Sequence, residues 1–379
     1  MAAAHAYDVI VVGLGAMGSA TAAHLAERGA RVLGVDRFTP PHEMGSSHGE
    51  SRIIRLACFE HPLYVPLVRR AYELWRRLER DAAAPGLLRV TGGLMLGSPA
   101  SGLIAGTRRA ATAHGVAIEE IPGSLLRDRF PQFTPMPGFT GVFDPAAGVL
   151  DPERCVQAHL ARAATHGAML RYDEPVLQWA PAGDGVRVRT SRGTYDADKL
   201  VLAAGPWMPE LLGALGPTLR VERQTVVWFD PPGDPDMWSP GRFPVYLCEF
   251  DDGQLVYGFP LQSRGWKAAV HYEGEAVTDM QKVRRSVETH DIARVRRAVT
   301  RLFPWVAAAP VRESACCFYT DTQDFRFVID FLPGMPQVLV SSPCSGHGFK
   351  FASAIGELQA QLLLDGRCTF DVTPFRLDR

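Results

Sequence analysis

Two adjacent cysteines, Cys316 and Cys317, could support redox, metal or covalent chemistry. Consecutive Cα atoms lie about 3.8 Å apart. A relaxed disulfide needs a separation of roughly 4.4 to 6.8 Å, so a bond between these two thiols would be strained. The other cysteines are scattered singly, without the C-x2-C pair that is typical of a zinc site. The pair is therefore either two small buried residues or includes a reactive thiol.

A polar segment at 42–55 carries a second group of candidate residues. Arg52 and Arg55 are three residues apart, and His48 lies just upstream. Charged residues that follow a strand are usually exposed to solvent. Composition alone therefore predicts a solvated loop here.

A third group lies in S-G-H-G-F-K at 345–350. The pattern predicts a glycine-rich helix start with Ser345, His347 and Lys350 in the first turn, and a helix end at Gly366. A lysine is unfavourable in a first turn because the helix dipole already places positive charge there. Lys350 therefore indicates an anionic neighbour or solvent exposure, and hints at a functional site.

The elements that would position these groups begin at the N-terminus. A continuous apolar run at 7–12 predicts a buried parallel strand. The glycine loop G-L-G-A-M-G (13–18) follows, then a helix that ends at Gly29, then a second strand at 31–36 that ends in Asp36. Strand, loop, helix, strand and terminal acid in this order predict a dinucleotide-binding unit.

Each glycine of the loop, and the terminal acid, has a physical role in such a motif. Gly13 permits the tight turn, Gly15 lets a pyrophosphate approach the backbone, and Gly18 allows close packing of helix and strand. The helix N-terminus supplies free N–H groups for the phosphates. Asp36 can accept hydrogen bonds from the ribose hydroxyls of an adenosine. At this point the nucleotide can be NAD or FAD.

The rest of the chain alternates between short strands and capped helices, which predicts an α/β fold, α+β overall. Helices are expected at 63–80, at 102–114 and after Asp151, which would act as N-cap with Pro152 at the first helical position. Between 218 and 315 the sequence becomes aromatic and alternates with period two. This pattern predicts an antiparallel sheet and a substrate domain.

The totals exclude several classes of function. The chain has 379 residues, 46% hydrophobic and 21% charged residues and a net charge of -1. This composition is that of a globular protein, and the charge gives no attraction to nucleic acid or an anionic membrane. No apolar stretch is long enough to predict a membrane span. Seven cysteines without regular spacing predict a reducing, cytoplasmic location and no metal site.

Six motifs in the same order resemble the monomeric sarcosine oxidase and N-methyltryptophan oxidase group of FAD-dependent amine oxidases, within the D-amino-acid-oxidase-like superfamily. The resemblance covers nearly the whole chain. Its pieces are V-V-G-L-G-A-M-G (11–18), G-x-x-H-G-x-x-R-I-I-R (45–55), Y-G-F-P (257–260), W-K-A-A-V-H (266–271), C-F-Y-T (317–320) and S-G-H-G-F-K-F (345–351).

The resemblance implies a task for the paired cysteines. In that family the cysteine of C-x-Y-T is bonded to the 8α-methyl group of FAD, so Cys317 would carry the flavin and Cys316 would be an inert neighbour. Cationic surroundings favour the required thiolate, and Arg52 and His48 would supply them.

The resemblance also implies the other site residues. Arg55 and Lys350 would hold the carboxylate of the substrate, and Lys267 would stabilise superoxide as electrons pass to O2. Tyr257 and His271 would line the substrate cavity and contact the substrate. The alternative is that they are part of the cavity wall without a specific role. Backbone N–H groups of 346–349 would face the pyrimidine end of the flavin. The remaining cofactor contacts implied are Ala16, Met17, Arg37, Ser46, Ser51, Arg52, Val176, Gly346, Gly348, Phe349 and Lys350.

The implied reaction is oxidation of a secondary-amine amino acid such as sarcosine or another N-methyl amino acid. Hydride would move to the flavin, the imine would hydrolyse to formaldehyde and a primary amino acid, and O2 would be reduced to hydrogen peroxide. The implied assembly is a monomer. It would consist of a discontinuous Rossmann-like FAD-binding domain (1–86, 145–217 and 316–379) and a mainly antiparallel substrate domain (87–144 and 218–315).

One departure from the family pattern leaves the substrate open. Pro343-Cys344 precedes S-G-H-G-F-K where the family usually has Gly-Phe, and the tryptophans Trp228, Trp238 and Trp266 suggest room for a substrate larger than sarcosine. A cyclic imino acid such as pipecolate or proline, or a biosynthetic imine, is one alternative. An NAD(P)-dependent dehydrogenase shares only the first motif, and an RNA-modifying flavoprotein would need a basic face.

Overall fold

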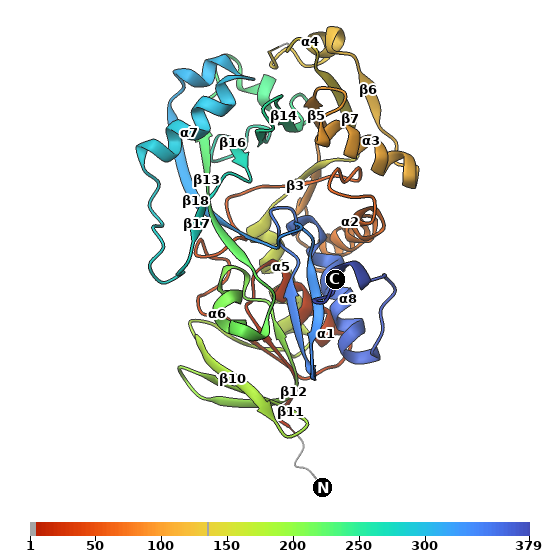
Figure 1. Ribbon diagram of the computed structural model, residues 1–379, viewed down its shortest axis with the longest axis vertical. Coiled ribbons are helices and arrows are strands. Elements are labelled where there is room, and N and C mark those ends of the chain that lie inside the picture. Colours follow the sequence, from red (N-terminus) through yellow and green to blue (C-terminus); the bar gives the residue numbers. More distant parts are fainter. Residues whose placement is uncertain (1–4, 135) are drawn as a thin grey trace.

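The computed structural model describes residues 5–134 and 136–379. Its strands form two large sheets and one small sheet, and helices pack against them (Figure 1). This mixed architecture confirms the predicted α/β class. Among the described residues, no helix combines the length and the apolar character that crossing a bilayer requires.

The first large sheet is built around β1 (Tyr7–Val12), the apolar run of the dinucleotide motif. β1 lies between β2 (Val32–Val35) and β12 (Thr194–Leu202), and both pairings are parallel. All three strands are buried along their apolar cores, as expected for parallel strands covered on both faces. The sheet is completed by β9 (Met169–Arg171), β10 (Val176–Ala182), β11 (Gly185–Thr190), β19 (Val328–Leu332) and β20 (Met335–Ser342).

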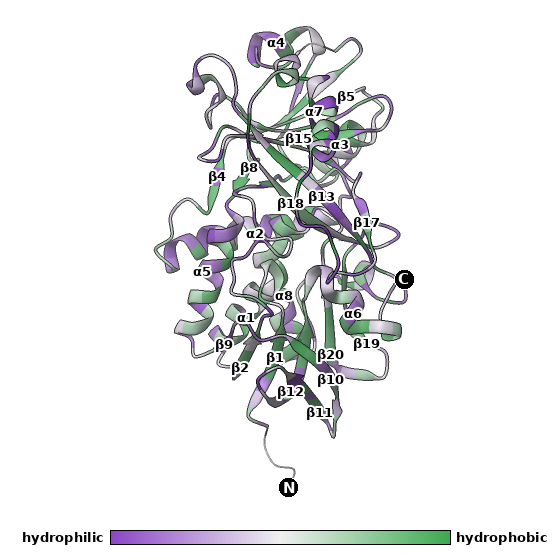
Figure 2. Ribbon diagram, turned by 90° about the vertical axis from the view of Figure 1, so that its left-hand side faces the viewer, coloured by the Kyte–Doolittle hydropathy of each residue, from purple (hydrophilic) through white to green (hydrophobic). Residues whose placement is uncertain are grey.

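Helices pack beside this sheet in the lower half of Figure 1. α1 (Ala16–Glu27) packs against α5 (Pro152–Thr165) and α8 (Ala352–Asp365), and α2 (Tyr64–Asp81) packs on α8. A Cβ atom at Gly356 would lie 2.6 Å from the backbone of Ala20, so a glycine is needed where α8 crosses α1. Figure 2 shows α1 and α8 largely hydrophobic, whereas α2 and α5 carry many hydrophilic residues. The helices expected after Asp151 and at 63–80 are confirmed.

The second large sheet occupies the upper half of Figure 1. Its strands are β5 (Gly93–Gly97), β6 (Glu119–Ile121), β7 (Thr140–Asp144), β13 (Arg220–Phe229), β14 (Val245–Glu249), β15 (Leu255–Gly258), β16 (Trp266–His271), β17 (Glu275–Val277) and β18 (Val311–Asp321). Most of its pairings are antiparallel, as the alternating pattern predicts, although β14 runs parallel to β5. α7 (Thr289–Thr300) packs on β13 and β16, and α3 (Gly102–His114) packs on β5. The short helix α4 (Leu126–Arg129) lies at the top of this half, whereas α6 (Met208–Leu212) lies in the lower half, where Met208 and Leu212 pack into the core of the first sheet (Figure 1).

The tryptophans of this half are core residues. Trp238 and Trp266 pack against each other with ring centroids 5.9 Å apart, inside an aromatic cluster that includes Phe243 and Phe303. Trp228 is fully buried. None of the three lines the large cavity of the described residues. The suggestion that they enlarge a substrate site is therefore wrong, because these side chains are buried in the core, away from the cavity.

A three-stranded sheet lies between the two large ones and contains the arginine segment. β3 (Arg52–Ile54) and β4 (Leu88–Val90) both pair antiparallel with β8 (Gly148–Leu150). Residues 52–54 thus form a strand, whereas residues 42–51 form neither helix nor strand. The predicted domain boundary at residue 316 falls inside β18, which pairs with β13 along its length.

The segment around Lys350 differs from the expected helix start. Residues 343–348 form turns, a 3-10 helix covers Phe349–Phe351, and α8 begins only at Ala352. Ser345 and His347 therefore do not lie in a helix. The positive φ of Ser345 (45°) and Gly346 (71°) bends the chain before the helix can begin. The predicted end at Gly366 is confirmed, with φ of 69°.

A buried carboxyl at the end of β18 should make stability depend on pH. Burial raises the pKa of Asp321 to about 7, with Glu222 nearby adding to the effect. The folded protein holds this proton more tightly than the unfolded chain does. As the pH rises from about 4 to about 7, we therefore expect the wild type to lose roughly 2 to 4 kcal/mol of its free energy of unfolding. Asp321→Asn should not show this loss. Urea titrations across this range measure it.

The matched control is Asp184→Asn, which changes an exposed turn residue. We expect the control to keep the wild-type pH profile. A wild-type profile for Asp321→Asn as well would show that Asp321 ionises normally.

Candidate active site

A cavity of about 460 Å³ runs between the dinucleotide motif and the second sheet. Its wall is formed by the glycine loop, the segment 35–48, β3, residues 203–207 before α6, β18 and the 343–350 turn. Most of the residues predicted from sequence line this one space: Gly13, Gly15, Ala16, Met17, Asp36, Arg37, Ser46, His48, Arg52, Arg55, Val176, Tyr257, His271, Cys317, Gly346, Gly348, Phe349 and Lys350. Gly18, Ser51 and Lys267 do not line it.

The glycine loop has the geometry that a bound pyrophosphate requires. Gly13 has φ of 88°, and a Cβ atom there would lie 2.6 Å from the carbonyl oxygen of Ala203. A Cβ atom at Gly18 would lie 1.7 Å from the carbonyl oxygen of Gly13, so only glycine lets α1 pack against the loop. The loop and the N-terminus of α1 therefore fit the phosphates of a dinucleotide.

Replacing Gly18 with alanine should prevent correct assembly of this loop. Because the added methyl group meets backbone atoms, we expect a loss of roughly 3 kcal/mol or more in the free energy of unfolding. We also expect purified Gly18→Ala protein to contain little flavin, as measured by its absorbance near 450 nm.

Gly29→Ala is the matched control. Gly29 also has a positive φ, of 84°, but a Cβ atom there meets nothing within 4 Å. The cost should be about 1 kcal/mol, from backbone strain alone, with normal flavin content. Equal flavin content in the two variants would contradict the packing argument.

Asp36 occupies the expected place at the end of the second strand. Its Oδ2 accepts a hydrogen bond from the N–H of Leu14 at 2.7 Å, and its Oδ1 accepts one from Phe38 at 2.9 Å. Asp36 thus ties the glycine loop to the segment after β2 and presents a carboxylate at the cavity wall. This position suits recognition of a ribose.

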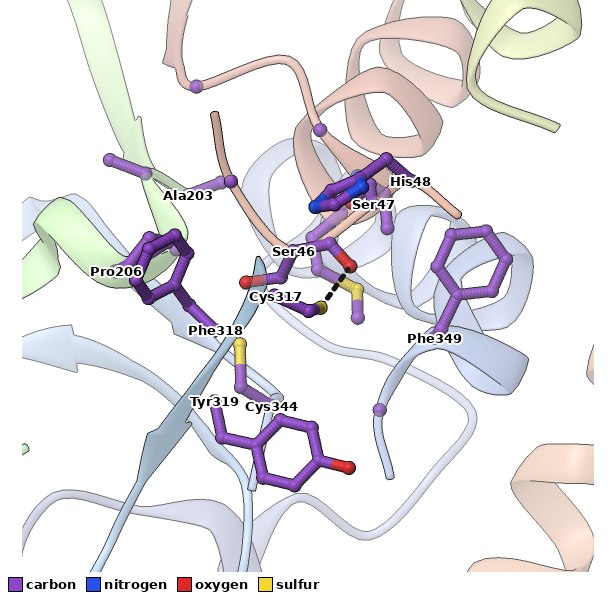
Figure 3. Close-up of a pocket in the computed structure, with 18 of the residues that line it drawn as sticks. Ser46, Ser47, His48, Ala203, Pro206, Cys317, Phe318, Tyr319, Cys344 and Phe349 are labelled. Atoms are coloured by element: carbon purple, nitrogen blue, oxygen red, sulfur yellow. Dashed lines mark hydrogen bonds between the residues drawn. The ribbon is translucent and has the colours of Figure 1, made fainter. Parts of the chain in front are cut away.

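Cys317 lies at the cavity wall on β18, and Figure 3 shows Ser46 and Cys344 near it. Nη2 of Arg52 lies 3.5 Å from its Sγ, and the carbonyl oxygen of Ser46 lies 3.8 Å from the same sulfur. Cys316 points to the other face of the strand, into an apolar cluster with Val221 and Met280. Burial raises the pKa of Cys316 to about 11, so this thiol stays protonated.

His48 does not provide the second cation that the sequence suggested. It lies at the cavity wall (Figure 3), and both of its ring nitrogens are buried without a hydrogen-bond partner. Burial, together with the charges of Arg52 and Lys267, lowers its pKa to about 3. The imidazole is therefore neutral at pH 7, with polar atoms available to a bound group.

Lys267 lies one layer behind the cavity wall, on β16. Its Nζ donates to the carbonyl oxygen of Gly49 at 2.7 Å and to the carbonyl and hydroxyl oxygens of Ser51 at 3.1 and 3.2 Å. Burial and the charge of Arg52 lower its pKa well below the usual range. Three oxygen acceptors nevertheless match the three N–H groups of an ammonium, which a neutral amine lacks. We conclude that the site holds the charged form at neutral pH despite the lowered pKa.

Two further cations, Arg55 and Lys350, meet around a carboxylate that sequence reasoning missed. Nη2 of Arg55 lies 2.7 Å from Oε1 of Glu60, and Nζ of Lys350 lies 3.6 Å from the same oxygen. We call these three residues the clamp. The indole N–H of Trp75 donates to the carbonyl oxygen of Lys350 at 3.0 Å, so α2 fixes this part of the turn. Of the two alternatives for Lys350, an anionic neighbour or solvent exposure, the structure shows the first, because Lys350 is buried beside Glu60.

Aromatic residues of the second sheet line the side of the cavity next to the clamp. Nδ1 of His271 lies 2.9 Å from the hydroxyl of Tyr319, and Tyr257 packs edge-on against His271 at 5.8 Å. Burial lowers the pKa of His271 to about 3, so this ring is neutral. A Cβ atom at Gly346 would lie 2.9 Å from the ring of Tyr319, which keeps the turn close to this wall.

One group of possible metal ligands exists among residues 5–134 and 136–379. The ligand atoms of Glu275, His290 and Asp291 lie within 4.8 Å of one another. Arg223 and Arg284 already pair with Asp291, at 3.0 and 2.7 Å. Two guanidinium groups at this distance oppose a bound cation.

Comparison with known proteins identifies the family. Residues 8–362 match the model of the "FAD dependent oxidoreductase" family. The chain belongs to this family. A monomeric sarcosine oxidase from Streptomyces avermitilis is 41% identical over 95% of this FAD-dependent oxidoreductase and 94% of the relative. An N-methyl-L-tryptophan oxidase from Salmonella heidelberg is 33% identical over 98% of this chain and 99% of its own. The resemblance seen in the sequence is therefore confirmed.

Solved structures agree with this family assignment. NikD, described as an unusual amino acid oxidase essential for nikkomycin biosynthesis, superimposes with a TM-score of 0.84 at 26% identity, over 98% of this chain and 97% of its own. Glycine oxidase from Geobacillus kaustophilus shares the fold, with a TM-score of 0.82 at 19% identity, over 99% of each chain. The predicted FAD cofactor, the Rossmann-like fold and the enzyme class of an FAD-dependent oxidase are confirmed.

Several cavity residues were missed from sequence. Glu60 lies in F-E-H-P, a stretch with no motif, although an acid near Arg55 was a possible signal. Tyr319 belongs to C-F-Y-T, yet its place beside His271 is visible only in the structure. Ser47 accepts a hydrogen bond from the N–H of Ala16 at 3.1 Å and so holds the glycine loop.

Proposed function

We propose that this protein oxidises an amino acid with a secondary amine, such as sarcosine or a larger N-methyl amino acid, with FAD as cofactor and O2 as acceptor. The observation that carries the proposal is the clamp, which brings two cations to the cavity wall beside the aromatic residues of β15, β16 and β18. The relatives named for sarcosine and N-methyl-L-tryptophan support the same substrate class.

The clamp would bind the substrate through its carboxylate. Arg55 and Lys350 carry strong hydrogen-bond donors for an anion, and both side chains are nearly fully buried, with exposed fractions of 3% and 5%. Burial strengthens such a contact because water does not compete there. The carboxylate would thus fix the orientation of the neighbouring C–N bond.

The aromatic wall would surround the amine. His271 is neutral at pH 7, as its pKa of about 3 implies, and the tyrosines are uncharged because burial raises the pKa values of Tyr257 and Tyr319. A neutral wall favours binding of the neutral amine, the form whose lone pair is free. FAD, when bound, supplies the acceptor for the hydride and passes the electrons to O2.

We further propose that FAD is attached through Cys317. The nearness of Arg52 to the sulfur supports this, since a guanidinium favours the thiolate. We also propose that Lys267 promotes the reaction with O2, that the two large sheets correspond to the FAD-binding and substrate domains, and that the protein is a cytoplasmic monomer. The seven free thiols suit a reducing compartment.

A cyclic imino acid is the second candidate. Pro343 and Cys344, where this chain departs from the family pattern, both line the cavity. Cys344 is a small apolar side chain at this wall, which would leave space for a ring. The same clamp would hold the carboxylate of such a substrate.

A peroxide-coupled screen tests both candidates. The holoenzyme is supplied with sarcosine, N-methyl derivatives of larger amino acids, pipecolate, proline and glycine, and hydrogen peroxide and formaldehyde are measured. Peroxide with equimolar formaldehyde supports the N-methyl class, and peroxide without formaldehyde from a cyclic substrate supports the alternative. Failure of every amino acid to reduce the flavin under anaerobic conditions would refute both.

A further inference from the structure

Glu60 is a buried carboxylate with one oxygen in use and one free. Its side chain is 10% exposed, and Oε1 contacts both Arg55 and Lys350. Oε2 is buried and has no hydrogen-bond partner. Glu60 also lines the cavity. A buried oxygen without a hydrogen-bond partner lowers the stability of the fold, so its presence at a cavity wall calls for a functional explanation.

Glu60 is ionised in spite of its burial. Burial raises the pKa of Glu60, but Arg55 and Lys350 outweigh this effect and hold the pKa well below its usual range. The clamp therefore combines two cations with one permanent anion. Its net charge is one positive unit, which balances a single carboxylate.

The other titratable groups near the clamp present no charge to the cavity. His347 lies 3.8 Å from Glu60, and burial lowers its pKa to about 4, so it is neutral at pH 7. Burial raises the pKa of Cys58 to about 12, so its thiol is protonated. Asp144 is buried and does not line the cavity; its carboxyl oxygens accept hydrogen bonds from the backbone N–H groups of 56, 57 and 146. His271 is neutral, as described above.

We propose that Glu60 is a specificity-determining residue that excludes substrates with a second acidic group. This inference rests on the proposed function, because it assumes that a substrate carboxylate binds to Arg55 and Lys350. A second carboxylate near the clamp would face Oε2 of Glu60 at short range in a site with little water. Like charges placed together in this way are strongly unfavourable, and this is a common way to reject a wrong ligand.

Two inert anions test the proposal without turnover. Acetate and malonate differ by one carboxylate, and their binding to the holoenzyme is measured by calorimetry and by the change in flavin absorbance. We expect the wild type to bind acetate at least about ten-fold more tightly than malonate. Glu60→Gln should shift the ratio of the two dissociation constants toward malonate by about ten-fold or more, because the repelling charge is gone.

Charge and shape are separated by a further variant. Glu60→Asp keeps the negative charge and should keep the wild-type preference for acetate. An unchanged ratio in Glu60→Gln, or an equal shift in Glu60→Asp, would overturn the proposal.

A matched pair of substrates tests the wild type alone, should a variant fail to fold. N-methylaspartate and N-methylasparagine have nearly the same shape and differ in one charge. We expect kcat/KM to be at least about ten-fold higher for the asparagine derivative. Equal values, with peroxide formed from both, would refute the task of Glu60 and leave the proposed function intact. If neither acetate nor malonate binds and no amino acid is oxidised, the clamp and the proposed function both fail.

Discussion

Replacing Cys317 with serine should release all of the flavin when the protein is denatured in acid. In the wild type we expect the yellow colour to stay with the precipitated polypeptide, because a thioether survives trichloroacetic acid. Serine cannot form this thioether, although the glycine loop and Asp36 should still bind FAD reversibly. The measurement is the share of the absorbance near 450 nm found in the supernatant.

Cys316→Ser is the control for this experiment. Cys316 is the neighbouring residue but faces the apolar cluster on the other side of β18. We expect its flavin to remain with the polypeptide. Release from the wild type, or retention by both variants, would show that Cys317 does not carry the cofactor.

Replacing Lys267 with methionine should slow oxidation of the reduced flavin by O2. A preorganised charge in a buried site typically accelerates a reaction that develops charge by roughly 100-fold to 1,000-fold. We expect a loss of this size in the oxygen reaction, with a much smaller effect on reduction by substrate. Stopped-flow measurements of the two half-reactions separate these effects.

The pKa of Lys267 adds a pH dependence to this prediction. Burial lowers the pKa, so the ammonium loses its proton at a lower pH than an ordinary lysine does. The wild-type oxygen reaction should therefore slow as pH rises through this pKa, and Lys267→Met should lack this decline. Lys282→Met, which changes a side chain that is 85% exposed, should behave like the wild type. Equal slowing of both half-reactions would remove Lys267 from its proposed role.

The local elements of this fold were predictable because each depends on a few neighbouring residues. Asp151 and Pro152 predicted the start of α5, and the side chain of Asp151 indeed accepts the N–H of Arg154 at 3.0 Å. The apolar run at 7–12 became β1, and the glycine loop lies at the cavity. Local rules of capping and burial suffice for such elements.

The parts that sequence did not predict depend on distant contacts. Residues 52–54 became a strand only because β8, almost 100 residues away, pairs with them. The helix start near Lys350 moved to Ala352 because the 343–348 turn packs against Tyr319 and His271. Glu60 was missed because only the fold brings Lys350 next to it. Long-range packing of this kind leaves no periodic signal in the chain.

β18 runs from the upper sheet down to the cavity wall, while the glycine loop that fits the phosphates belongs to the lower sheet (Figure 1). A cofactor anchored at Cys317 and held by that loop would act as a non-protein crosslink between the two halves of the molecule. Heating the loaded enzyme should then melt both halves in a single event. In enzyme whose flavin is not bonded to Cys317, the two halves would melt separately.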